Sequence, residues 1–137
     1  MLESAAAAAA RYAQVRDSTS TPGDLLLALY DGLFRFLNGA KLCMENKQLP
    51  RARELLSKCH AIISELMIAL DHDVAPELCG QLEGLYQFCI DRLQTASRKG
   101  EITPIEEVVR VLTPLREAWI LAVPKAIQEA HAANNKR

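Results

Sequence analysis

The sequence predicts an all-α protein, an antiparallel up-down four-helix bundle with a short N-terminal helical extension. Four long stretches carry apolar residues at spacings of three and four, the period of a helix with one buried face. Short turns with Pro, Gly or Asp separate these stretches, so consecutive helices are expected to run antiparallel. Half of the residues are hydrophobic but only 5% are aromatic, and such an aliphatic composition favours helices over a β-sandwich.

Residues 1–20 are expected to form an alanine-rich extension and a polar link. Alanine favours a helix strongly, but it buries too little surface to hold that helix in place. Tyr12 and Val15 are the largest apolar groups near its end, so they are expected to contact the body of the protein. Residues 21–130 are expected to form the bundle, and residues 131–137 a frayed tail.

The first long helix, expected over residues 21–44, is the element around which the others are arranged. Thr21 can cap it, Pro22 suits its first position, and Asp24 places a carboxylate near the positive end of the helix dipole. At about 100° per residue, its apolar side chains cover about half of the circumference, more than a surface helix needs. Several neighbours must therefore bury it.

Three further helices follow from similar signals. Pro50 suits the first turn of the second helix, and Asp73 is expected to cap the third. The fourth helix is expected to start at the capping sequence T-P-I-E over residues 103–106. Pro114 is expected to bend this helix, and Pro124 to bend or end it.

The composition excludes several classes of function. A formal net charge of -1, with acids and bases interspersed, provides no basic field for a phosphate backbone, so no nucleic-acid partner is expected. No apolar run approaches the length of about 20 residues that spans a bilayer, and no basic leader precedes the alanines. We therefore expect a cytoplasmic protein without membrane insertion.

No residue pattern indicates catalysis, a metal or a cofactor. The cysteines lie far apart without a C-x-x-C pair, which is typical of small buried hydrophobes in a reducing compartment; they are Cys43, Cys59, Cys79 and Cys89. The chain also lacks the inward-pointing Glu-x-x-His pairs that build metal sites in bundles, as well as a Gly-rich phosphate loop. We expect a protein that is not an enzyme and binds no cofactor.

A histidine phosphotransfer module is the alternative function that the sequence leaves open. That class is also a four-helix bundle, with one reactive histidine exposed on a helix. His60 lies near the border of the apolar stripe of the second helix. The class places a lysine and a glycine just after the histidine, whereas Ala61, Ile62 and Ile63 follow here.

The order and spacing of several short motifs resemble the flagellin-specific export chaperone family FliS. The opening P-G-D-L-L-L-A-L-Y-D-G at residues 22–32, with Y-A-Q-V at 12–15 before it, carries the sharpest likeness. It continues at residues 52–54, 63–66 and 115–119. The chain departs from the family in its alanine-rich start, in Ser97 where the family usually has asparagine, and in Pro114.

The resemblance implies a cytoplasmic chaperone without enzymatic activity. Such a protein would bind the disordered C-terminal segment of flagellin, prevent premature polymerisation and present the subunit to the flagellar export gate. Other flagellar regulators and weak pairing of two copies are further candidate interactions. The family's N-terminal segment, which here contains Tyr12 and Val15, would lie over part of the flagellin site and move aside.

The candidate flagellin-binding residues combine that segment with surplus apolar side chains of the helices. They are Tyr12, Val15, Leu26, Tyr30, Phe34, Leu37, Ile68 and Phe88. Four of them form one edge of the first long helix, which could face a groove; Ile68 and Phe88 lie off the stripes of their own helices. For the six helix residues an alternative interpretation stays open: Leu26, Tyr30 and Leu37 as ordinary core, and Phe34, Ile68 and Phe88 as singly exposed apolar side chains.

Overall fold

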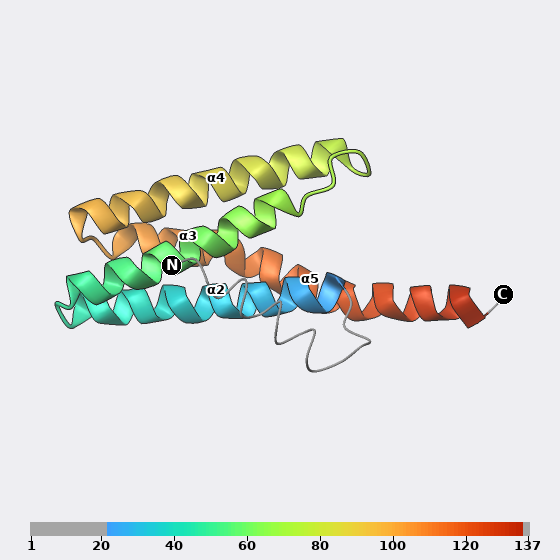
Figure 1. The fold of residues 1–137 in the computed structure, drawn as a ribbon, viewed down its shortest axis with the longest axis horizontal. Helices are drawn as coiled ribbons and strands as arrows, with labels where there is room; N and C mark the ends of the chain where they lie inside the picture. The colour runs from blue at the N-terminus through green and yellow to red at the C-terminus, as the bar shows by residue number, and fades with distance from the viewer. Residues whose placement is uncertain (1–21, 136–137) are drawn as a thin grey trace.

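The computed structural model describes residues 22–135, and side chains as far as residue 124. Four helices make up this part of the chain: α2 (Pro22–Glu45), α3 (Leu49–Ile68), α4 (Pro76–Lys99) and α5 (Thr103–Asn135). Figure 1 shows α2 and α4 running in one direction and α3 and α5 in the other. Each helix packs on its neighbours in the chain, and α5 returns to pack on α2. The predicted all-α, up-down four-helix bundle is confirmed.

Proline and glycine punctuate the helices as expected at three of their ends. Proline occupies the first turn of α3 and of α4. Gly100 ends α4 in the left-handed conformation, with φ of 67°, and its N–H donates to the carbonyl of Ala96 at 2.8 Å. This φ suits glycine because no Cβ has to be accommodated.

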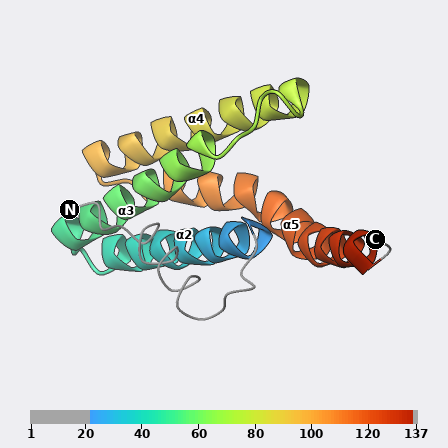
Figure 2. The ribbon, with the colours of Figure 1, turned by 45° about the vertical axis from the view of Figure 1, so that its right-hand side comes forward.

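Two details of the helix ends differ from the sequence prediction. Asp73 does not cap α4; Ala75 is the N-cap residue and makes no side-chain hydrogen bond there. The N–H of Asp73 instead donates to Oδ1 of Asp71 at 3.2 Å, so the carboxylate of Asp71 organises the turn. Pro124 does not end the last helix, because α5 continues to Asn135 and extends beyond the other helices (Figures 1 and 2).

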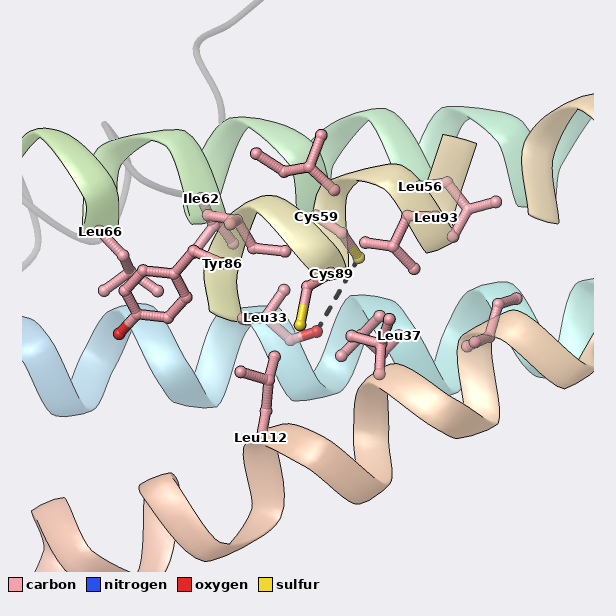
Figure 3. Close-up of a cluster of buried hydrophobic side chains, with 14 of the residues drawn as sticks. Leu33, Leu37, Leu56, Cys59, Ile62, Leu66, Tyr86, Cys89, Leu93 and Leu112 are labelled. Atoms are coloured by element: carbon pink, nitrogen blue, oxygen red, sulfur yellow. Dashed lines mark hydrogen bonds between the residues drawn. The ribbon is translucent and has the colours of Figure 1, made fainter. Parts of the chain in front are cut away.

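The core is aliphatic and runs along the middle of the bundle. Figure 3 shows side chains from all four helices meeting there, among them Leu33, Ile62, Cys89 and Leu112, each at most 5% exposed. The cysteines among the described residues are free, and burial raises the pKa of the Cys89 thiol to about 12. Such a thiol stays protonated and behaves as a small hydrophobe. The predicted burial holds for Cys59, Cys79 and Cys89, whereas Cys43 is only partly buried.

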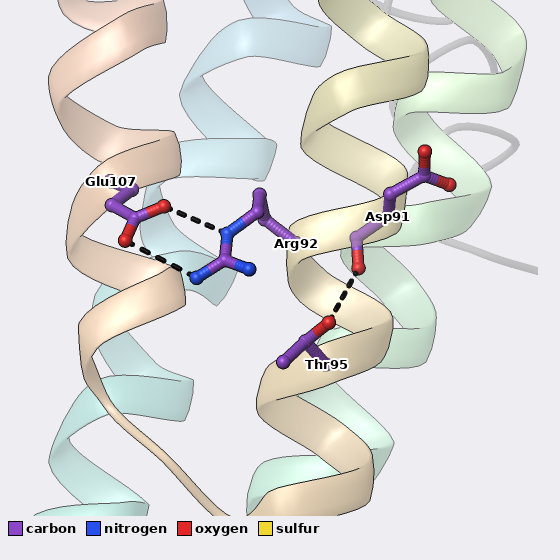
Figure 4. Close-up of polar contacts among 4 residues, drawn as sticks. All are labelled: Asp91, Arg92, Thr95 and Glu107. Atoms are coloured by element: carbon purple, nitrogen blue, oxygen red, sulfur yellow. Dashed lines mark hydrogen bonds and ion pairs between the residues drawn. The ribbon is translucent and has the colours of Figure 1, made fainter.

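Ion pairs fasten α5 to both of its neighbours. Nε and Nη2 of Arg92 on α4 donate to the two carboxylate oxygens of Glu107 on α5, at 2.7 and 3.2 Å (Figure 4). Nη2 of Arg116 donates to Oδ1 of Asp31 on α2 at 2.6 Å. These contacts fix the position of α5, whose later residues reach one end of the bundle.

Candidate functional site

An apolar groove lies at the end of the bundle where α2 begins, α3 ends and α4 begins. Its volume is about 430 Å³, within the range of about 300–1,000 Å³ that is typical of ligand sites. Residues of all four helices and of the α3–α4 connection line it, including Leu25, Leu26, Leu66, Leu70, Val74, Leu78, Tyr86 and Trp119. Asp71 is the charged residue among those that line it. We call this feature the apolar groove.

The local sequence explains why the bundle is open at this end. The α3–α4 connection, residues 69–75, is longer than the other two connections between described helices. It carries Val74, which is 78% exposed, and leads to Leu78 in the first turn of α4, which is 50% exposed. Large apolar side chains that stay exposed around a concave surface are typical of a binding site.

The surplus apolar surface of α2 contributes to the same groove. Leu25 and Leu26 pack against the core but stay partly exposed, whereas Leu29, Leu33 and Leu37 further along α2 are buried. Pro22, the first described residue, lies at the groove as well. The wide apolar arc predicted for this helix is therefore used in two ways, for the core along most of its length and for the groove near its start.

A small polar cluster lies at the floor of the apolar groove. The hydroxyl groups of Tyr30 and Tyr86 are 2.6 Å apart and share a hydrogen bond between α2 and α4. Burial raises the pKa of both phenols. The buried Nε1 of Trp119 lies beside the Tyr30 hydroxyl.

The predicted edge of the first long helix does not form one surface. Leu26 lies in the apolar groove and is partly exposed. Tyr30 and Leu37 are 0% exposed and belong to the core, in agreement with their alternative interpretation. Phe34 is partly buried on the side of α5, where the guanidinium carbon of Arg116 lies 5.4 Å from its ring centroid.

The remaining predicted site residues lie elsewhere. Ile68 is 77% exposed and lines a shallower depression between α3 and α4 with His60 and Ile90. Phe88 is 43% exposed on α4. Tyr12 and Val15 fall outside the described residues.

Sequence reasoning missed Val74 and Leu78 as groove residues. The signal was present for Val74, a large apolar residue in a turn that otherwise holds Asp71, His72 and Asp73. Leu78 falls on the apolar stripe of its helix, so periodicity assigned it to the core. The structure shows its side chain half-exposed at the apolar groove.

The rest of the described surface shows no built reaction centre. His60 is exposed on α3, and the polar side chains at its depression include Ser57 and Gln94. Over the described residues, no group of three or more His, Cys, Asp or Glu side chains is placed to hold a metal ion. Nor is any helix of that part both long enough and apolar enough to cross a membrane.

Comparisons with known proteins agree on one family. The family model described as "Flagellar protein FliS" matches residues 4–126. The flagellar secretion chaperone FliS of Bacillus subtilis (strain 168) is 32% identical over 122 residues, which cover 89% of this chain and 90% of that protein. The flagellar secretion chaperone FliS of Salmonella typhimurium (strain LT2) is 34% identical over 120 residues, or 84% of this chain and 89% of that protein.

A solved structure shares the fold. The crystal structure of a flagellar chaperone from bacteria superposes with a TM-score of 0.71 at 27% sequence identity. The superposition covers 87% of this chain and 97% of that chain.

Proposed function

This chain belongs to the FliS family of flagellar secretion chaperones, and from that premise we propose that it binds the disordered C-terminal segment of flagellin in the cytoplasm. Bound in this way, the flagellin subunit is kept from polymerising and is presented to the flagellar export apparatus. The role requires binding and release, and no catalytic step.

The apolar groove is the observation that carries the proposal. A disordered segment pays ordering entropy when it binds, so it needs apolar surface that is ready to be covered. An amphipathic helix formed on binding can place its apolar face in a groove between helices. The exposed side chains of Val74 and Leu78 and the partly exposed Leu26 offer that surface.

Surfaces outside the groove support an extended path for the segment. Ile68 and Phe88 are large apolar side chains that stay exposed on α3 and α4. A chain that follows the bundle over such contacts buries more area than one groove provides. The export apparatus, other flagellar regulators and a second copy of this chain are the further partners that we propose.

Pro22 is the first residue of α2 and lines the apolar groove. We propose that Tyr12 and Val15 cover part of the flagellin site and move aside when flagellin binds.

Titration calorimetry with a peptide of the C-terminal flagellin segment from the same genome tests the proposal. We expect binding near one to one, with a negative heat-capacity change because apolar surface is buried. A scrambled peptide of the same composition is the control, since it keeps the hydrophobicity but loses the helical stripe. Absence of heat with the native peptide at several temperatures would overturn the proposed function.

A further inference from the structure

The end of the bundle that holds the apolar groove is acidic. This end comprises residues 22–34, 59–91 and 111–124, which contain the start of α2, the end of α3, the start of α4 and the later part of α5 (Figure 1). These residues include nine acidic residues and one basic residue, Arg116. The guanidinium of Arg116 is already paired with the carboxylate of Asp31. The acidic charge of this end is therefore largely without a basic counterpart among the described residues.

The opposite end of the bundle is basic. Residues 35–58 and 92–110 contain ten basic and five acidic residues. No lysine or arginine occurs between Lys58 and Arg92, a stretch that runs from the middle of α3 through the α3–α4 connection into α4. The formal net charge of -1 thus conceals a separation of charge. The interspersed charges expected from the sequence are gathered by sign in the fold.

Part of the acidic charge lies at the rim of the apolar groove. Asp71 lines the groove directly, and Asp73 follows two residues later in the α3–α4 connection. Glu77 lies in the first turn of α4, next in sequence to the groove residue Leu78. The side chains of Asp71, Asp73 and Glu77 are all exposed. We call these three residues the acidic rim.

The acidic rim has no cationic partner within the described part of the chain. Asp71, Asp73 and Glu77 form no ion pair there. The nearby His72 lies 3.5 Å from a different carboxylate, with its Nε2 next to Oε2 of Glu83. Like charges gathered in this way create a negative potential, which raises the local concentration of cationic ligands. The groove therefore combines an apolar surface with an edge that attracts positive charge.

We propose that the acidic rim selects the bound segment by charge: the flagellin segment that enters the apolar groove carries lysine or arginine beside its apolar stripe, and these side chains pair with Asp73 and Glu77. This inference rests on the proposed function. Complementary charges at the edge of an interface steer association and fix the orientation of the partner. The segment proposed to compete for the groove has the same pattern, since residues 11–16 read R-Y-A-Q-V-R, with arginine at both ends.

Titration of the C-terminal flagellin peptide at low and high salt, about 50 and about 500 mM NaCl, tests the inference. Salt screens exposed ion pairs, whereas it does not weaken apolar contacts. With two exposed pairs in the complex, the affinity of the wild-type chain should fall about fivefold between the two conditions. An uncharged or acidic segment in the same groove would bind equally well or more tightly at high salt.

The double variant Asp73→Asn, Glu77→Gln removes the two carboxylates from the rim. It should bind the peptide about fivefold more weakly than the wild type at low salt, and equally at high salt. The double variant Glu45→Gln, Glu101→Gln is the matched control, because it changes the net charge equally at exposed positions of the basic end. The control should stay within about twofold of the wild type at low salt. Asparagine suits turns and glutamine suits helices, so both variants should keep their helical content by circular dichroism.

Peptides in which each lysine or arginine is replaced singly by glutamine identify the partner of the rim. At a position that contacts the rim, the replacement should weaken binding to the wild type about two- to threefold but leave binding to Asp73→Asn, Glu77→Gln unchanged. Equal losses against both chains at every position would show that the basic residues of the peptide contact another surface, which overturns the inference.

The outcomes separate this inference from the proposed function. If the wild-type chain binds no peptide at either salt concentration, the proposed function fails, and this inference fails with it. If the peptide binds with an affinity that neither salt nor Asp73→Asn, Glu77→Gln changes, this inference alone is overturned. Tighter binding by that variant would show that the acidic rim repels the segment, and it would overturn the inference as well.

Discussion

The guanidinium of Arg116 on α5 donates to the carboxylate of Asp31 on α2 across 2.6 Å, although the two residues lie 85 positions apart in the sequence. The same guanidinium carbon lies 5.4 Å from the centroid of the Phe34 ring. One side chain thus combines an ion pair with a cation–π contact and fastens α5 to α2. Trp119, one turn further along α5, is thereby held against the apolar groove.

Arg116→Ala should lower the free energy of unfolding by about 1 kcal/mol, because it removes both contacts and the packing of the side-chain stem. Urea denaturation measures the change. Arg51→Ala is the control, since Arg51 forms an exposed pair with Glu54 within α3 and should contribute less than about 0.5 kcal/mol. Equal effects of the two substitutions would show that the contact with Phe34 adds nothing.

Gly23 allows α2 to approach α5 closely, so Gly23→Ala should destabilise the protein. A Cβ built at Gly23 would lie 2.6 Å from Cγ1 of Val123, a short branched side chain that is itself buried. Gly84→Ala should instead stabilise by about 0.5–1 kcal/mol, because nothing lies within 4 Å of its Cβ and alanine favours a helix. The melting temperatures of both variants test this prediction. A higher melting temperature for Gly23→Ala would mean that α2 and α5 separate easily.

The free energy of unfolding should fall as the pH rises above about 9, because buried thiols stay protonated in the folded state at a pH where they lose their protons in the unfolded chain. Burial raises the pKa of Cys89 from 9.0 to about 12. The contribution of this thiol to stability is fully present below its pKa in the unfolded chain. It is lost as the pH rises from there through the pKa in the folded state, with a slope of up to about 1.4 kcal/mol per pH unit. Urea unfolding between pH 8 and 10 measures this slope, which Cys89→Ala should reduce. An unchanged slope would show that the thiol titrates normally.

Local signals predicted most of the fold. Pro50, Pro76 and Gly100 mark helix ends through backbone restrictions that act within one turn, and the period of the apolar residues marks the buried faces. The end of α5 was not predictable in this way. A proline inside a helix removes one hydrogen bond, but the helix can continue beyond it, as it does at Pro124.

The candidate site was less predictable, because it depends on contacts between distant residues. Tyr30 and Tyr86 each fall on an apolar stripe, and nothing in either stripe shows that their hydroxyls meet across 56 positions. The apolar period also cannot distinguish a residue that another helix covers from one on the same stripe that no helix covers. Leu37 and Leu78 illustrate the two cases, since the first is fully buried and the second half-exposed.

Leu78→Gln should weaken binding of the flagellin peptide about tenfold, because the substitution removes from the groove apolar surface that the peptide would cover. Leu42→Gln is the matched control: Leu42 is 57% exposed, as Leu78 is at 50%, but it lies near the far end of α2, outside the groove. Glutamine is tolerated in helices, so both variants should keep their helical content by circular dichroism. Equal binding by the two variants would place the flagellin site elsewhere on the bundle.

Deletion of residues 1–15 should tighten peptide binding, because the proposed cover no longer competes with the peptide. If the cover occupied the groove in about nine of ten molecules, its removal would raise the apparent affinity about tenfold. Replacing Tyr12 and Val15 together by serine keeps the length of the segment and should reproduce most of the gain, which separates apolar contact from mere steric bulk. Calorimetry of the three chains with one peptide gives the comparison. If the deletion leaves the affinity unchanged, the N-terminal segment covers no surface that flagellin needs; if it weakens binding, the segment contributes to the site itself.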